Sequence, residues 1–178
     1  MKAVSSRYRL SLTRWRGWRA KCMRALVAVV LSAAAAPSLA AVTCTISAPA
    51  LAFGAYDVFA GTLITSTTVI SVTCTLTGAV NTTVPYTVSL STGSSATYVQ
   101  RTMKSGLNTL GYNLYTTVGR TTVWGDGTGA TATVGGSLSL TTGTRSRTGT
   151  STVFGAVPAL QDSKVGVYAD NITMTVTY

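Results

Sequence analysis

Apolar and polar residues alternate in short stretches from residue 41 onward. The clearest stretch is 172–178, where Ile172, Met174, Val176 and Tyr178 are separated by threonines. Successive side chains of an extended strand point to opposite faces, so a period of two residues predicts a strand with one buried face. The same alternation predicts strands at 42–46, 70–76, 86–90, 110–114, 134–140 and 172–178.

Turn-forming residues separate these stretches, as at 91–95, 106–108 and 124–127. Several short strands spaced in this way are typical of an antiparallel β-sandwich of immunoglobulin-like kind. The composition does not change along the chain after the first 41 residues, so we expect a single all-β domain. The stretch 141–152, rich in Thr, Gly, Ser and Arg, is expected to be a mobile loop with Arg145 and Arg147 in solvent.

The first 41 residues have a different character. An uncharged apolar run at 25–36 follows a cationic segment and precedes Ser38-Leu39-Ala40-Ala41. These are the parts of a secretory signal peptide, and the run is shorter than the roughly 20 residues that span a bilayer. We therefore divide the chain into a leader at 1–41 and a domain at 42–178, with cleavage after Ala40 or Ala41, and expect no stable membrane span in the mature chain. A membrane-anchoring helix is the alternative.

Cysteine usage agrees with export. Cys22 lies within the predicted leader, which leaves Cys44 and Cys74 in the domain. Each belongs to the apolar face of its predicted strand, so both point into the core, and an exported protein with two cysteines most simply forms one disulfide. A metal site or a cysteine nucleophile is the alternative, but the chain has no histidine to complete either.

The charge pattern excludes several classes of function. The chain carries 14 Lys and Arg against 4 Asp and Glu, a formal charge of +10, but eight of the cations lie within the first 24 residues. The domain itself keeps six cations and four acids, so it lacks the basic surface that a nucleic-acid-binding protein needs. Without histidine, and with four scattered aspartates, we expect no enzyme, no cofactor and no metal site.

The remaining polar candidates have ordinary structural interpretations. We expect Asp57, Asp126 and Asp170 to form turns or accept buried hydrogen bonds, and either Asp170 or Asp57 to pair with Arg101. Trp124 belongs either to the core or to an exposed site that would favour adhesion.

The predicted strand at 172–178 has two interpretations. It is either the last strand of a closed sandwich or a strand beside an empty slot that another chain fills by strand addition. An open edge with an apolar face promotes aggregation, so a secreted protein must cover it.

Short motifs run through the domain in a fixed order. After Cys44 they are Leu51-Ala52-Phe53-Gly54-Ala55-Tyr56-Asp57, Ile70-Ser71-Val72-Thr73-Cys74, Arg101-Thr102-Met103, Leu110-Gly111-Tyr112-Asn113-Leu114-Tyr115-Thr116, Trp124-Gly125-Asp126-Gly127-Thr128, Phe154-Gly155-Ala156-Val157-Pro158-Ala159-Leu160-Gln161 and Gly166-Val167-Tyr168-Ala169-Asp170. Each motif is weak by itself, but the ordered series resembles the spore coat protein U domain family, the subunits of archaic (Csu-type) chaperone–usher pili.

The resemblance implies a non-enzymatic subunit with an incomplete, pilin-type immunoglobulin-like sandwich that lacks one strand. A periplasmic chaperone lends a strand, and its basic residues hold the C-terminal carboxylate, here that of Tyr178. At the outer-membrane usher, the N-terminal extension of a sibling subunit replaces the chaperone. The acceptor groove would be lined by Ile172, Met174 and Val176, with Tyr178 at its end.

One departure from the family pattern affects the expected role. After cleavage only Ala41-Val42-Thr43 precedes Cys44, and three residues reach about 10 Å, too short to complete a neighbour. The resemblance then implies a tip or terminal subunit of a cell-surface pilus with an adhesive role in attachment or biofilm formation. A stand-alone secreted spore-coat or matrix protein, self-completed by residues 55–68, is the alternative.

Overall fold

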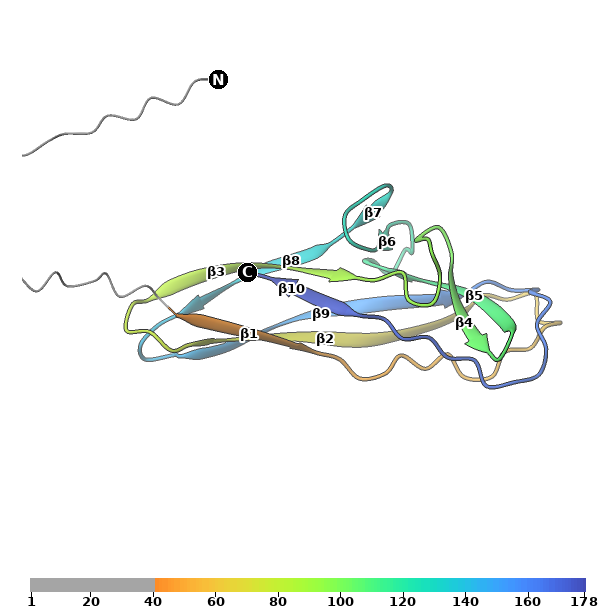
Figure 1. Ribbon diagram of the computed structural model, residues 1–178, viewed down its shortest axis with the longest axis horizontal. Coiled ribbons are helices and arrows are strands. Elements are labelled where there is room, and N and C mark those ends of the chain that lie inside the picture. The colour runs from red at the N-terminus through yellow and green to blue at the C-terminus, as the bar shows by residue number, and fades with distance from the viewer. Residues whose placement is uncertain (1–40) are drawn as a thin grey trace, which may run out of the picture. The chain divides into compact units, whose positions relative to one another are not determined.

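The structure, a computed structural model, describes residues 41–178, which form strands and no helix (Figure 1). The strands are β1 (Val42–Ser47), β2 (Ile64–Leu76), β3 (Thr82–Leu90), β4 (Arg101–Ser105), β5 (Asn108–Tyr115), β6 (Val123–Trp124), β7 (Thr131–Ala132), β8 (Val134–Leu140), β9 (Ser146–Val157) and β10 (Met174–Thr177). The predicted leader, apart from its last residue, lies outside the described residues. None of the segments from 41 to 178 is a helix that could cross a membrane.

Two sheets stack to form the sandwich (Figure 1). The larger has the order β1-β2-β9-β5-β6-β7, with β4 also paired to β5, and the smaller has the order β10-β3-β8. Strand pairs are antiparallel except β6 and β7. The prediction of an all-β antiparallel sandwich is confirmed.

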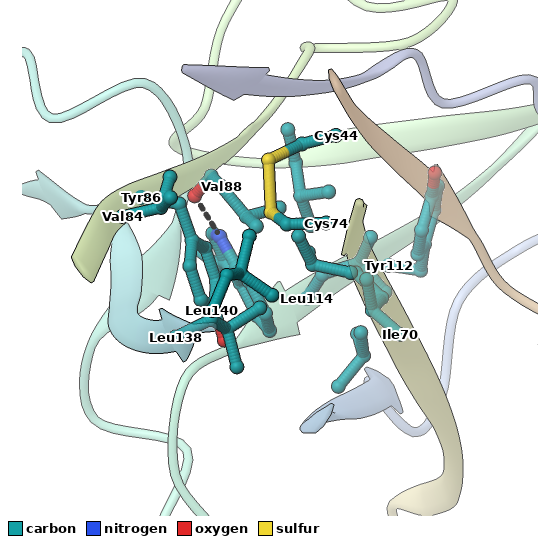
Figure 2. Close-up of a cluster of buried hydrophobic side chains, with 14 of the residues drawn as sticks. Cys44, Ile70, Cys74, Val84, Tyr86, Val88, Tyr112, Leu114, Leu138 and Leu140 are labelled. Atoms are coloured by element: carbon teal, nitrogen blue, oxygen red, sulfur yellow. Dashed lines mark hydrogen bonds between the residues drawn. A yellow bond between two sulfur atoms is a disulfide. The ribbon is translucent and has the colours of Figure 1, made fainter. Parts of the chain in front are cut away.

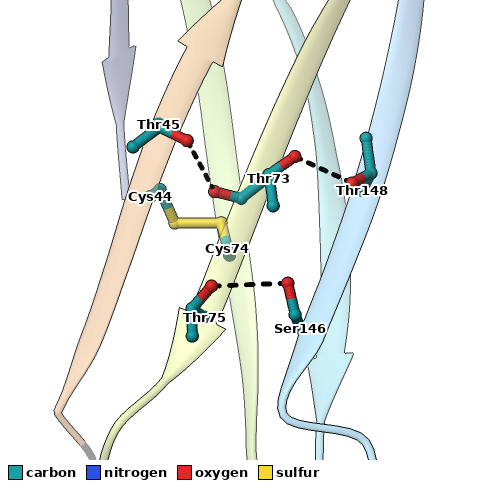
Figure 3. Close-up of a disulfide and its surroundings, with 7 residues drawn as sticks. All are labelled: Cys44, Thr45, Thr73, Cys74, Thr75, Ser146 and Thr148. Carbon is teal, nitrogen blue, oxygen red and sulfur yellow. Dashed lines mark hydrogen bonds between the residues drawn. A yellow bond between two sulfur atoms is a disulfide. The ribbon is translucent and has the colours of Figure 1, made fainter.

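The core lies between the two sheets and is built from the apolar positions of the alternating stretches. Ile70, Val72 and Leu76 of β2 face Val88 and other apolar side chains of the opposite sheet, all of them buried (Figure 2). The predicted disulfide is present: Cys44 and Cys74 lie opposite each other in the β1–β2 ladder and their sulfurs are bonded (Figures 2 and 3). Closing this loop stabilises the fold by roughly 3–4 kcal/mol in the chain-entropy estimate.

The prediction of a mobile loop at 141–152 is wrong. Residues 146–157 form β9, which pairs with β2 along its whole length and is the third strand of the larger sheet. The composition of this stretch suggests a loop because small residues occupy some of its inward positions. At those positions, side chains from other segments fill the space between the sheets. A side chain at Gly149 would collide with the hydroxyl of Tyr86, which reaches over from β3. Arg145, at the preceding turn, donates from Nη1 to the carbonyl oxygens of Leu76 (3.3 Å) and Gly78 (3.2 Å).

The outward face of β1, β2 and β9 is lined by hydroxyl side chains (Figure 3). Thr73 and Thr148 share a hydrogen bond between their hydroxyls of 2.8 Å, and Thr75 and Ser146 share one of 3.3 Å. This face is therefore polar without being charged, which explains how threonine-rich strands satisfy the alternation of a half-buried sheet.

Candidate strand-acceptor groove

The candidate site lies on the side of the sandwich that is bordered by β1, an edge strand of the larger sheet, and by β10, an edge strand of the smaller one (Figure 1). Within residues 41–178, β1 pairs only with β2 and β10 pairs only with β3. One side of the sandwich is thus bordered by two strands that each leave a row of backbone groups unpaired.

Hydrogen-bond parity identifies the unpaired groups of β10. The N–H of Ser91 donates to the carbonyl oxygen of Thr173 (3.0 Å), so the backbone of Thr173, and of every second residue after it, faces β3. The N–H and C=O groups of Ile172, Met174 and Val176 then point to the open edge. Their side chains point between the sheets, as their partial burial against the core shows.

The same parity holds on the opposite edge. The N–H of Thr77 donates to the carbonyl oxygen of Ala41 (2.8 Å), which turns the backbone groups of Val42, Cys44 and Ile46 away from β2. On both edges, therefore, the residues that direct side chains inward also present unpaired backbone groups.

An open cavity of about 420 Å³ lies along this side of the sandwich. Its lining is mainly apolar and includes Ile70, Leu90, Met103, Tyr112, Leu114 and Val153 from the core and Ile172 and Met174 beside β10. Of the predicted groove residues, Ile172 and Met174 line this cavity and Val176 is partly buried against the core. Tyr178 follows the end of β10 and is 53% exposed.

The second wall of the groove comes from residues 48–53, which sequence reasoning did not assign. Leu51 and Phe53 pack over Gly155 of β9, where an added side chain would approach Leu51 Cδ2 to 2.5 Å and Phe53 Cζ to 2.7 Å. The ring of Phe53 meets that of Tyr112 edge-on, with centroids 5.9 Å apart. Both contacting motifs, Leu51-Ala52-Phe53 and Phe154-Gly155-Ala156, are visible in the sequence. No pattern within either motif shows that the two contact each other.

A second cavity of about 640 Å³ continues the groove beyond the start of β10. It shares Leu51, Phe53, Met103 and Tyr168 with the first cavity. Its outer wall is the segment 163–168, in which Val165 and Val167 are almost fully exposed. The apolar groove therefore continues beyond the first residue of β10, toward residues 54–58 and 163–168.

The spore coat protein U domain family profile matches residues 29–175, which include all strands except the last residues of β10. The chain belongs to this family. The recognition from the ordered motifs is confirmed, and the match covers β1 and the beginning of β10.

Two further comparisons add little to this assignment. No curated protein matches the chain. Among solved structures, it is similar to a chain in the crystal structure of the CsuC–CsuE chaperone–tip adhesion subunit pre-assembly complex from the archaic chaperone–usher Csu pili of Acinetobacter baumannii. The two are 23% identical with a TM-score of 0.46, and the similarity covers 78% of this chain but only 40% of that one.

The segment expected to fill the gap in the self-completed alternative is elsewhere in this spore coat protein U domain. Residues 64–68 belong to β2 and pair with 153–157 of β9 in the larger sheet. Residues 55–63 form a loop at the end of the domain, where the Tyr56 hydroxyl donates to the carbonyl oxygen of Pro158 (3.0 Å). Residues 55–68 therefore pair with neither β1 nor β10 and add no strand to the open edge.

The expected ion pair of Arg101 with Asp170 or Asp57 is also absent. The guanidinium is fully buried and donates to the carbonyl oxygens of Ser91 and Trp124 and to Oδ1 of Asn113, at 2.7–3.0 Å. It also lies 5.2 Å from the centroid of the Tyr98 ring. Burial lowers the pKa of Arg101 below its ordinary value. The flat fork of the side chain suits convergent carbonyl groups, so neutral acceptors replace the carboxylate.

The aspartates and Trp124 have the structural roles expected of them. Asp57 Oδ1 accepts from the N–H of Phe59 (2.9 Å), and Asp126 Oδ1 accepts from the N–H and hydroxyl of Thr128, which lowers the pKa of Asp126. Trp124 is fully buried and donates from Nε1 to the carbonyl oxygen of Val88 (3.0 Å), so it belongs to the core. Between residues 41 and 178, no three His, Cys, Asp or Glu side chains gather as metal ligands would.

Proposed function

We propose that this domain is a non-enzymatic subunit of a chaperone–usher pilus and that the groove along the open edge of β10 accepts a strand from another polypeptide. The observation that carries the proposal is that the same residues of β10 and its approach have both unpaired backbone groups and inward apolar side chains. Ile172, Met174 and Val176 point both their unpaired backbone groups and their apolar side chains toward the slot. A strand added there pairs its backbone with β10 and inserts alternate side chains into the cavity, and membership of the spore coat protein U domain family supports this function.

The energetics favour such an interaction. Burying four or five apolar side chains of the incoming strand contributes roughly 6–15 kcal/mol before ordering costs, at about 1.5–3 kcal/mol each. That range is sufficient to hold an assembly together without covalent links.

The proposed partners act in sequence. A periplasmic chaperone fills the groove first and holds the carboxylate of Tyr178, and a sibling subunit replaces it at the outer-membrane usher. The predicted leader supplies the export signal, and the assembled fibre is displayed at the cell surface.

The proposed tip or terminal position is supported by the beginning of the domain. Val42 and Thr43 are already part of β1, and the carbonyl oxygen of Ala41 accepts hydrogen bonds from Thr77 and Gly78. If processing occurs at the predicted site, every residue after it is engaged in this subunit's own sheet. The subunit then accepts a strand without donating one.

An adhesive role is supported by apolar side chains on the loops at one end of the domain. The loops at 54–63 and 158–168 meet where Tyr56 contacts Pro158 and Gln161, and Gly166 lies against Ser105 of the β4–β5 hairpin. The exposed apolar side chains on these loops are Phe59, Leu63, Leu107, Leu160, Val165 and Val167. Several exposed apolar side chains on neighbouring loops are typical of interaction sites, and we propose attachment to surfaces as their use.

The strand-acceptor function is tested by expression in the periplasm with and without an archaic-type chaperone. We expect most of the chain expressed alone in the periplasm to aggregate or be degraded, and co-expression to yield a stable one-to-one complex. The domain refolded at low concentration, where aggregation is slow, serves for measurements on the free protein. Met174→Lys places a charge in the groove and should abolish the complex. Thr175→Lys is the matched control, because Thr175 lies on the same strand with its side chain exposed on the outer face.

A soluble, heat-stable monomer that forms without any chaperone would contradict the proposal and favour the stand-alone coat or matrix protein. The terminal position has its own test, which is the N-terminal sequence of the mature protein. A mature chain that begins a dozen or more residues before Cys44 would overturn it.

A further inference from the structure

Asp170 is the one charged side chain among the described residues that line the first cavity. It lies two residues before Ile172 and on the same wall as Ile172 and Met174. A strand that pairs with the open edge of β10 and continues two residues beyond Ile172 therefore places an inward side chain beside this carboxylate, because residues two apart share a face. The groove thus has an apolar length and one acidic end.

The carboxylate is fixed in place but not saturated. Its Oδ1 accepts from the N–H groups of Ser94 and Asn171 (both 2.8 Å), and its Oδ2 accepts from the hydroxyl of Tyr112 (2.6 Å). An ionised carboxylate accepts about four hydrogen bonds, so one position remains. Gly93 lies so close that a side chain there would collide with the carboxylate, so the absence of a side chain at Gly93 allows Asp170 to approach the 91–95 loop.

Within residues 41–178, no basic side chain contacts this carboxylate directly, although Arg101 lies near enough to interact with it electrostatically. Tyr112 stays a neutral donor, because burial and the hydrogen bond to Asp170 raise its pKa above the ordinary value. Arg101 is fully buried, and its hydrogen bonds go to the carbonyl oxygens of Ser91 and Trp124 and to Asn113. Asp170 is half-buried and faces the cavity, so a group that enters the groove meets the carboxylate and not the guanidinium.

We propose that the groove selects a partner strand that carries a lysine or arginine at the end of its apolar row, opposite Asp170. This inference rests on the proposed strand-acceptor function and adds the chemistry of the partner. An apolar residue at that position would cover the carboxylate and remove it from water without replacing the lost hydration. A basic residue forms a charge-assisted hydrogen bond instead, which corresponds to roughly a tenfold to hundredfold gain in affinity.

The experiment uses a displayed library of twelve-residue peptides as the probe. Every second position is Val, Ile or Leu, the positions between are Ser or Thr, and each apolar position in turn is fully randomised. Selection on the wild-type protein should enrich Lys or Arg at one terminal position of the apolar row. Selection on Asp170→Asn should lose this preference, and Asp162→Asn, at an exposed position outside both cavities, should retain it.

The best peptide is then compared with its Lys→Met version on the wild-type protein, a measurement that needs no protein variant to fold. We expect the Met version to bind about tenfold to a hundredfold more weakly, with a difference that shrinks as salt is raised. Enrichment of alternating apolar peptides without a basic residue, or equal binding of the two versions, would overturn the inference and leave the strand-acceptor function intact. If no alternating peptide is enriched at all, both proposals are wrong.

Discussion

The polar groups around Arg101 find their hydrogen-bond partners within the domain, whereas the groove beside β10 leaves backbone groups unpaired and apolar side chains half-exposed. Around Arg101, a fully buried cation and the buried indole of Trp124 direct their N–H groups to protein acceptors. Along the groove, apolar side chains such as Ile172 and Met174 remain half-buried, and the backbone of β10 is unpaired on one side. The first region is complete within one chain, whereas the second remains open within residues 41–178, and in the proposed function a partner strand completes it. Stability should therefore be concentrated in the first region and partner dependence in the second.

Removal of the buried cation should have the largest effect. Arg101→Met removes the donor to the carbonyl oxygens of Ser91 and Trp124, and each buried unsatisfied group costs about 1–3 kcal/mol. It also removes one of the two donors to Oδ1 of Asn113, which keeps the N–H of Leu114. We expect the free energy of unfolding in urea to fall by about 3 kcal/mol or more. Arg147→Met, at an exposed position, should leave the midpoint unchanged. A similar small loss in both variants would show that the network around Arg101 does not stabilise the fold.

Truncation of one apolar side chain in each region sharpens the contrast. Leu140→Ala, at a fully buried position, should cost about 3 kcal/mol, whereas Met174→Ala should cost about 1 kcal/mol in the isolated domain. With a strand bound in the groove, the cost of Met174→Ala should approach that of Leu140→Ala, because Met174 is then covered. Urea unfolding of the free domain and of its chaperone complex measures both values. An unchanged cost on complex formation would place the strand elsewhere.

Alkaline pH tests the polar contact that joins the two regions. The pKa of Tyr112 is raised in the folded state, so its contribution to stability is complete below the ordinary tyrosine pKa of about 10 and is lost as the pH rises above it. Tyr112→Phe should lose about 1 kcal/mol at pH 7 with the hydrogen bond to Asp170. Above pH 10, its unfolding free energy should fall less steeply than that of the wild type, by up to about 1.4 kcal/mol per pH unit. Parallel pH profiles would contradict this assignment.

The smallest effect is expected on the outer hydroxyl face. Thr148→Val removes the hydrogen bond to Thr73 but keeps the β-branched shape that suits a strand. We expect a change of about 0.5 kcal/mol or less in the free energy of unfolding. A loss comparable to that of Leu140→Ala would contradict the assignment of Thr148 to a solvent-exposed face.

Sequence reasoning located most of the elements that flank the groove and few of the contacts that shape it. The alternation at 172–178 predicted β10 and the side of it that faces the core, and the positions of Cys44 and Cys74 predicted their disulfide. It missed β9, because Gly149 and Gly155 stand where Tyr86, Leu51 and Phe53 occupy the space. It also assigned a carboxylate partner to Arg101, because the count of charges cannot show that three neutral acceptors meet there.

The amino-acid sequence by itself determined the all-β class, the spacing of the strands and the inward side of each apolar row. These features follow from a period of two residues along a single strand. Only the tertiary structure decided that residues 48–53 form the second wall of the groove, that Asp170 stands at its acidic end and that Arg101 is buried among carbonyl groups. Such contacts join segments that are far apart in the chain, and side chains from different strands meet only after the two sheets have stacked.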